Sequence, residues 1–64
     1  MSTEMHPLIY MTLEHHQLLV VRHREVGPLY AYLTVLDRFG FYREVKLFVE
    51  RDDDGYLYAE LIDY

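Results

Sequence analysis

The chain has 64 residues and a formal net charge of −5, which fits one small acidic domain. The acidic balance disfavours direct binding to nucleic acid, because phosphate backbones need a basic surface. Cysteine is absent, which excludes disulfide bonds and thiolate metal sites.

Hydrophobic residues make up 52% of the chain, and seven residues are tyrosine. A domain of this size buries only about 60% of the surface that its unfolded chain exposes. One small core cannot absorb so much apolar surface, so we expect a homo-oligomer or a protein partner to cover part of it.

The sequence carries no sign of a membrane segment or of a secretion signal. No apolar run approaches the roughly 18 residues that cross a bilayer. The first residues also lack the basic, apolar and small-residue order of a signal peptide. We therefore expect no membrane association and a cytoplasmic location.

The first half of the chain suggests a hairpin. Residues 1–6 are mostly polar and are expected to be frayed. Strands are predicted at residues 8–13 and 18–24, with a turn at His15 and His16 that sets Leu13 opposite Leu18. Both faces of this hairpin are apolar near the turn, which is typical of strands covered on both sides.

Residues 28–39 fit two structures. As a helix, the segment has Pro28 at its first position and Gly40 just beyond its end. As a strand, it continues into a three-residue turn that ends at Gly40. The pattern Asp-x-x-Gly-aromatic occurs at residues 37–41 and again at 52–56, and this repeat favours the strand.

Residues 43–64 contain the clearest hairpin. Apolar residues alternate with polar ones on both sides of an Asp-rich turn. A three-residue turn with a left-handed Gly55 pairs Val49 with Ala59. A two-residue turn would instead set Glu60 opposite Val49 and place its charge in the core.

These elements predict an all-β domain spanning residues 1–64, a five-stranded antiparallel meander that is curled or half-barrelled. The alternative is an α+β domain of order ββαββ with its helix at residues 28–39. The predicted core consists of Leu29, Leu33, Val45, Leu47, Val49, Leu57 and Leu61.

The same register gathers aromatic residues on the opposite sheet face, with Tyr30 opposite Phe48 and Tyr32 opposite Lys46. Aromatic centres with charged rims are typical of protein-binding surfaces. The predicted partner-binding residues are Tyr30, Tyr32, Phe48, Tyr58 and Ile62. The predicted acidic rim consists of Glu50, Asp52, Asp53, Asp54 and Glu60. The alternative interpretation is that a helix or another subunit covers this face as ordinary core.

No catalytic motif is visible. The chain has no Gly-rich phosphate loop, and its one serine is Ser2. Four histidines, His6, His15, His16 and His23, lack the spacing of a metal site, so we expect no metal and no cofactor. Imidazole titrates near neutrality, so a pH-sensitive contact at His23 is a further hypothesis.

The sequence thus favours a non-enzymatic protein-binding module or regulator that self-associates through an aromatic sheet face. The alternative is an acidic inhibitor, of the kind that a phage or mobile element encodes, that blocks a nucleic-acid-binding partner by mimicry of phosphates. In both cases the identity of the partner protein is open.

Overall fold

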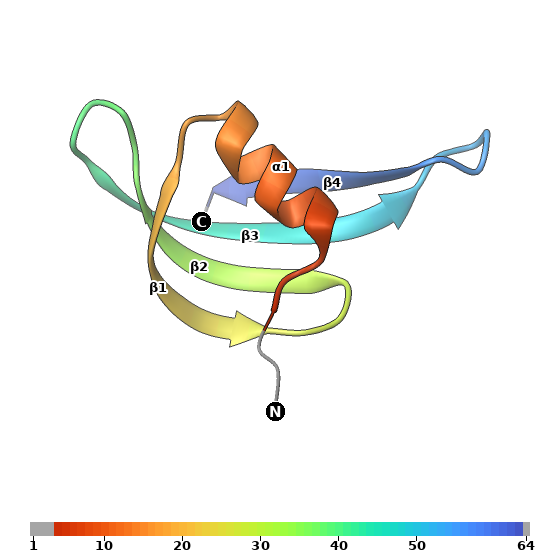
Figure 1. The fold of residues 1–64 in the computed structure, drawn as a ribbon, viewed down its shortest axis with the longest axis horizontal. Helices are drawn as coiled ribbons and strands as arrows, with labels where there is room; N and C mark the ends of the chain where they lie inside the picture. The colour runs from red at the N-terminus through yellow and green to blue at the C-terminus, as the bar shows by residue number, and fades with distance from the viewer. Residues whose placement is uncertain (1–3, 64) are drawn as a thin grey trace.

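A computed structural model describes residues 4–63 as one helix packed on an antiparallel sheet (Figure 1). The sheet is a simple meander with the strand order β1-β2-β3-β4, and it is not closed into a barrel. In chain order the elements are α1 (Pro7–His15), β1 (Leu19–Val26), β2 (Tyr30–Leu36), β3 (Tyr42–Arg51) and β4 (Leu57–Asp63).

The two turns that flank β3 have the same construction. In each, an aspartate carboxylate accepts hydrogen bonds from the backbone N–H groups two and four residues further on: Asp37 from Phe39 and Phe41, and Asp52 from Asp54 and Tyr56. The glycine that follows is left-handed in both turns, with φ of 86° at Gly40 and 89° at Gly55. The repeated sequence pattern therefore encodes one turn used twice.

The predicted register of the last three strands is confirmed. Tyr30 pairs with Phe48 and Tyr32 with Lys46 between β2 and β3. Between β3 and β4, Val49 pairs with Ala59, as the three-residue turn at Gly55 required. The expected continuation of this hairpin to residue 64 lies outside the described residues.

The predicted first hairpin is wrong, because residues 8–13 form most of α1 rather than a strand. Pro7 stands at the start of the helix, and the Nδ1 atom of His6 accepts the N–H of Leu8 at 3.1 Å. Met5, Ile9 and Leu13 are spaced four residues apart and are all buried, which is a helical period. Gln17, at a φ of 57°, turns the chain away from the helix.

The fold therefore has four strands instead of five, and β1 pairs with β2 instead of with residues 8–13. The alternative fold correctly combined a helix with an antiparallel sheet but put the helix at residues 28–39, where the structure has β2. Residues 4–6 are not frayed, since Met5 is buried and His6 caps α1; residues 1–3 lie outside the described part.

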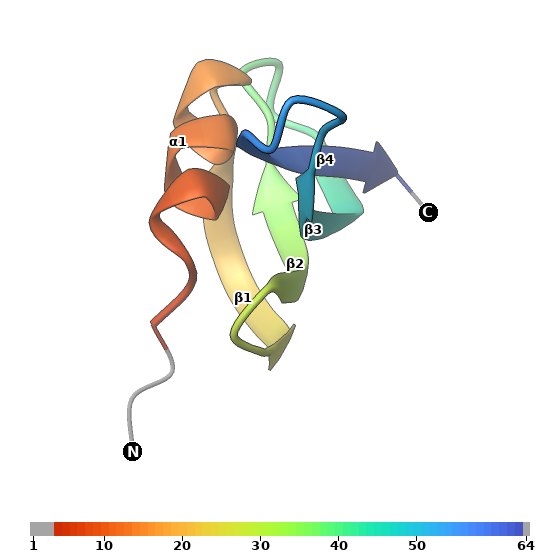
Figure 2. The same ribbon diagram turned by 90° about the vertical axis from the view of Figure 1, so that its right-hand side faces the viewer.

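The core lies between α1 and one face of the sheet (Figure 2). The sheet contributes Ala31, Leu33, Val35, Val45, Leu47 and Val49; the helix and its flanks contribute Met5, Ile9, Leu13 and Leu18. Leu61 of the predicted core is partly buried and packs against this cluster. The prediction was wrong for Leu29 and Leu57, which are 53% and 45% exposed.

The short helix explains these two exposed leucines. A nine-residue helix is about 14 Å long, whereas a seven-residue strand spans about 23 Å. Leu29 precedes β2 and Leu57 begins β4, so both lie at the ends of strands that α1 is too short to cover fully. Within the described residues, no helix is long and apolar enough to cross a membrane.

Candidate functional site

The face of the sheet turned away from α1 carries the predicted partner-binding residues, and we call it the open face. Figure 2 shows α1 on one side of the sheet and no helix on the other. Alternation along β2, β3 and β4 puts Tyr30, Tyr32, Phe48, Tyr58 and Ile62 on this side, because the neighbouring residues Ala31, Leu47 and Val49 point to the core.

Three rings form the centre of the open face, and we call them the aromatic cluster. The ring centroids of Tyr30 and Tyr32 lie 5.5 Å apart, and those of Tyr32 and Phe48 lie 6.1 Å apart, the second pair edge to face. These are favourable separations for aromatic pairs. Lys46 places its Nζ atom 5.6 Å from the centroid of Tyr32, within range of a cation–π contact.

Gly27 makes room for the cluster at the turn before β2. A Cβ atom built on Gly27 would lie 2.1 Å from Cε1 of Tyr30, so no larger residue fits beneath this ring. The N–H of Gly27 also donates to the carbonyl of Tyr30 at 2.9 Å. The turn thus fixes where the first ring of the cluster lies.

The tyrosine hydroxyls are held by glutamates at the margin of the face. The hydroxyl of Tyr30 donates to Oε2 of Glu25 at 2.7 Å, and that of Tyr58 donates to Oε2 of Glu50 at 3.1 Å. Each hydrogen bond, together with the nearby negative charge, raises the pKa of its tyrosine above the usual value. Both phenols are protonated at neutral pH, and each donates its hydroxyl proton to a glutamate carboxylate.

A polar group separates the aromatic cluster from the other end of the face. The hydroxyl of Thr34 donates to Glu44, and Arg24 forms an ion pair with the same carboxylate. The hydrogen bond from Thr34, followed by the contact with Arg24, lowers the pKa of Glu44 below its usual value. Glu44 therefore carries a negative charge on the open face at neutral pH.

Beyond Glu44 lies a second apolar area that the sequence analysis missed. Leu19 pairs with Leu36, and Leu36 pairs with Tyr42, in a row across β1, β2 and β3. Leu19 and Tyr42 are 66% and 70% exposed. The three-residue turn at Gly40 also sets Leu36 opposite Tyr42, so the sequence could have placed Tyr42 on this face. It could not have placed Leu19, because the β1–β2 register shifts at two points.

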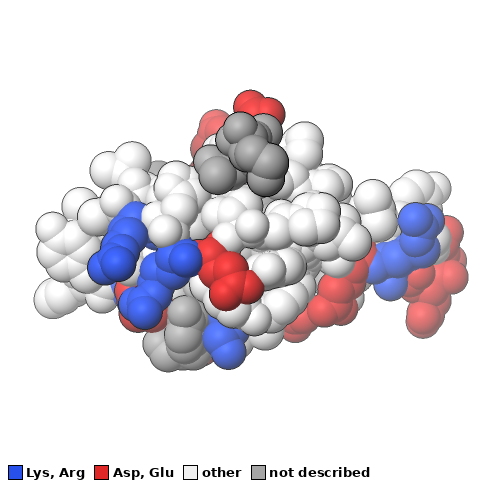
Figure 3. All heavy atoms as spheres, turned by 90° about the horizontal axis from the view of Figure 1, so that it is seen from below, with Lys and Arg blue, Asp and Glu red and all other residues white. Residues whose placement is uncertain are grey.

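The predicted acidic rim divides between two places. Glu50 and Glu60 lie on the open face, opposite Tyr58 and Phe48. Asp52, Asp53 and Asp54 instead occupy the β3–β4 turn, where the Asp52 carboxylate stabilises the turn itself. Figure 3 shows this turn as a charged end of the molecule, while charges of both signs are scattered elsewhere on that side.

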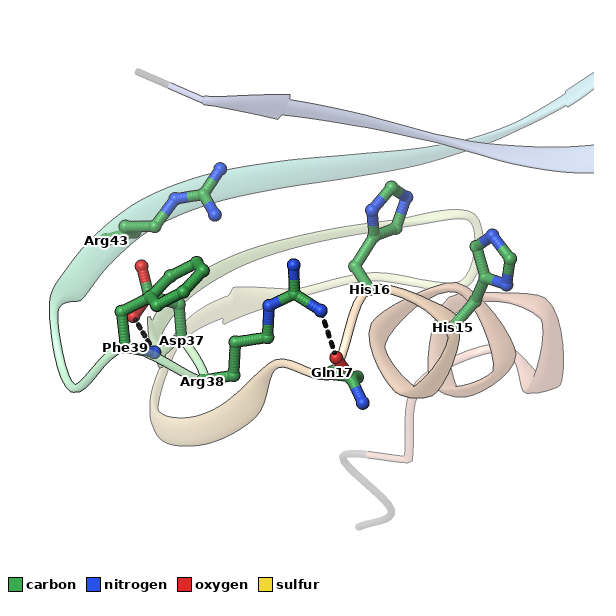
Figure 4. Close-up of a pocket in the computed structure, with 7 residues that line it drawn as sticks. All are labelled: His15, His16, Gln17, Asp37, Arg38, Phe39 and Arg43. Carbon is green, nitrogen blue, oxygen red and sulfur yellow. Dashed lines mark hydrogen bonds between the residues drawn. The ribbon is translucent and has the colours of Figure 1, made fainter.

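A shallow cavity of about 300 Å³ lies apart from the open face, where the end of α1 meets the β2–β3 turn (Figure 4). Arg38 donates to the side-chain oxygen of Gln17 at 2.9 Å and lies 4.9 Å from the centroid of Phe39. Arg43, also on its wall, forms an ion pair with Asp63. These contacts join the turn to the helix end and leave both guanidinium groups partnered.

Three of the four histidines, His6, His15 and His16, lie at the ends of α1. The rings of His15 and His16 are 5.4 Å apart and edge to face, and His6 caps α1. Within residues 4–63, no group of three or more His, Cys, Asp or Glu residues is arranged to hold a metal ion. His23 is exposed in β1, opposite Leu33, and the hypothesis of a pH-sensitive contact there stays a prediction.

No protein-family model matches this chain, no curated protein matches its sequence, and no solved structure matches its fold.

Proposed function

We propose that this protein is a non-enzymatic protein-binding module whose open face docks onto a partner and onto a second copy of the chain. The observation that carries the proposal is the aromatic cluster, which packs ring against ring on the side of the sheet opposite α1. The three rings are half-buried, and Tyr58 and Ile62 on the same face are exposed. An apolar patch on the uncovered side of a small domain is characteristic of an interaction site.

The side chains of the aromatic cluster are preorganised in the free protein. Tyr30 is held by Gly27 below and by Glu25 at its hydroxyl, and Tyr32 lies between Tyr30 and Phe48. Side chains that are already ordered lose little conformational entropy on docking, and rigid aromatic side chains are common anchors in interfaces.

Self-association is favoured by the mixture of charges around the rings. The open face carries the acidic Glu50 and Glu60 and also the basic Lys46. Two copies related by a two-fold axis present the same surface to each other, and a face with both signs can be complementary to itself. Docking would act sterically, by covering the partner's surface or by holding two chains together.

The test is a double truncation, Tyr30→Ala with Phe48→Ala, measured by light scattering and sedimentation. We expect the native chain to be a dimer and this variant to be a monomer, because two of the three rings of the aromatic cluster are removed. The matched control is Tyr56→Ala, which removes a 73% exposed ring in the β3–β4 turn, away from the cluster. A strictly monomeric native chain, or a double variant that still dimerises, would contradict self-association.

A further inference from the structure

The two edges of the sheet differ in how well they could accept another strand. The β1 edge is interrupted by register shifts between Val20 and Arg22 and between His23 and Glu25. Irregularities of this kind, together with charged side chains, protect an edge from further pairing. The β4 edge has no such irregularity, since its pairing with β3 runs without interruption from Leu57 to Asp63.

The backbone groups that β4 presents at its edge can be identified. The N–H of Asp52 donates to the carbonyl of Tyr56 at 2.9 Å, and hydrogen-bonded pairs alternate along an antiparallel ladder. Counting from this pair, residues 58, 60 and 62 bond to β3. The N–H and C=O groups of residues 57, 59, 61 and 63 therefore point outward, where the sheet of residues 4–63 has no further strand.

A groove runs beside this edge. It has a volume of about 460 Å³ and lies between the helix and β4. Its walls carry Leu8, Met11, Thr12, His15 and His16 on the helix side and Leu57, Tyr58 and Ala59 on the strand side. Met11 is 62% exposed and Leu57 45% exposed, so the groove offers apolar surface. A strand edge beside a helix, with a groove between them, is the arrangement in which an extended peptide can add to a sheet.

The charges of β4 select the chemistry of the added strand. β4 contains no basic residue and follows three aspartates. Of its two acidic residues, Asp63 is paired with Arg43 of β3, so Glu60 is the charge that a partner strand would meet. A second copy is disfavoured there, because the antiparallel register that pairs all seven residues sets Glu60 opposite Glu60 and Leu57 opposite Asp63. A segment with basic residues on the open-face side suits the edge better.

We propose that the β4 edge and the adjoining groove bind an extended peptide segment in which apolar and basic residues alternate. The segment adds antiparallel to β4, with its apolar side chains toward Met11 and Leu57 and a basic side chain opposite Glu60. This site goes beyond the proposed function, since the aromatic cluster on β2 and β3 takes no part in it.

The test uses a capped peptide of the length of β4 in which valine and lysine alternate, with binding followed by amide shifts in NMR spectra. The amides of residues 57, 59 and 61 are expected to shift and to exchange more slowly with solvent. In antiparallel pairing the valines lie opposite these residues, so valine amides bond to β4 and lysine amides point away.

Methylated forms of the same peptide provide the matched control. Methylating the valine amides removes the donors that face β4 and is expected to weaken binding more than about tenfold. Methylating the lysine amides leaves these donors intact and is expected to have little effect. Any other ranking of the two peptides overturns the proposal.

A charge exchange tests the chemistry of the partner. Glu60→Lys is expected to lose affinity for the lysine peptide and to gain affinity for a peptide with glutamate at the same positions; an unchanged preference overturns the proposed selection. The double variant at Tyr30 and Phe48 is expected to bind the lysine peptide as the native chain does. Failure of this site is thus distinguishable from failure of the open face.

Discussion

At the scale of single residues, the open face depends on a few polar contacts that fix the orientation of larger side chains. Glu25 and Glu50 each accept a hydrogen bond from a tyrosine hydroxyl. Glu44 accepts hydrogen bonds from the side chains of Thr34 and Arg24. All of these contacts are near solvent, so each one contributes little to stability. Their effect is to order the surface that a partner would meet.

The tyrosine titrations test this ordering. Glu25→Gln is expected to lower the pKa of Tyr30 toward its usual value, because it removes the charge and weakens the hydrogen bond that favours the neutral phenol. Glu50→Gln should do the same for Tyr58 alone. Ultraviolet titration of the two variants, each serving as the control for the other, measures both effects. If neither tyrosine responds, the hydroxyl contacts do not form in solution.

Glu44 gives a prediction for the acid range. Its folded-state pKa is lowered, so its contribution to stability is present above its unfolded pKa and is lost as pH falls through the folded pKa. Thr34→Val removes the largest cause of the shift. We expect this variant to lose stability at neutral pH and to approach the native chain at low pH, in urea unfolding measured across that range.

At the scale of the elements, the predictable parts are those in which local chemistry and strand alternation agree. The Asp-x-x-Gly-aromatic pattern occurs twice and predicted both turns that flank β3. The two turns together determine the register of three strands. The helix was missed because residues 8–13 are apolar on both faces when treated as a strand. Its true signal was the spacing of Met5, Ile9 and Leu13, which begins in a segment expected to be frayed.

The same reasoning explains what was found and missed at the candidate site. Tyr30, Tyr32 and Phe48 could be placed together because the turn at Gly40 has a unique register. The contacts of Glu25 with Tyr30 and of Arg24 with Glu44 could not be predicted, because β1 departs from strict alternation at two points. The groove beside β4 could not be anticipated either, since one of its walls is α1.

Gly55 tests the turn that sets the β3–β4 register. Gly55→Ala is expected to destabilise the protein by about 1 kcal/mol, because its φ of 89° is strained for any residue with a Cβ atom. Gly55→Asn should lose less, since asparagine adopts left-handed conformations more readily. Urea unfolding of both variants measures the difference, and equal losses would argue against a left-handed residue in this turn.

The docking of α1 is tested by a large-to-small substitution. Ile9 is fully buried, and Ile9→Ala is expected to cost about 2–5 kcal/mol. A domain of this size has a total stability of roughly 3–10 kcal/mol, so the variant should be partly or wholly unfolded. Met11→Ala, on the exposed side of the same helix, is the control and should change stability by less than about 0.5 kcal/mol. Similar losses in the two variants would show that α1 does not pack as described.

At the scale of the whole molecule, apolar contact and charge make different predictions about binding. The aromatic cluster would hold a second copy through burial of apolar surface, which salt does not screen. The three aspartates of the β3–β4 turn would act on a partner through long-range attraction, which salt weakens.

A salt series therefore separates the two mechanisms. If the rings of the open face drive self-association, the dimer dissociation constant should not rise steeply between low and high sodium chloride concentrations, as measured by sedimentation. Reversing Asp53 and Asp54 to lysine should leave that constant unchanged, since both residues lie in the turn rather than on the open face. A steep weakening with salt would instead favour the acidic inhibitor.

The position of α1 has a consequence for how the chain reaches this structure. The helix is synthesised before the sheet, yet it packs against β3 and β4, the two strands farthest from it in the sequence. The three hairpin connections of the meander are local in sequence, whereas the docking of the helix closes a loop over almost the whole chain. On the ribosome, the apolar side of α1 must therefore remain uncovered until β3 and β4 have emerged.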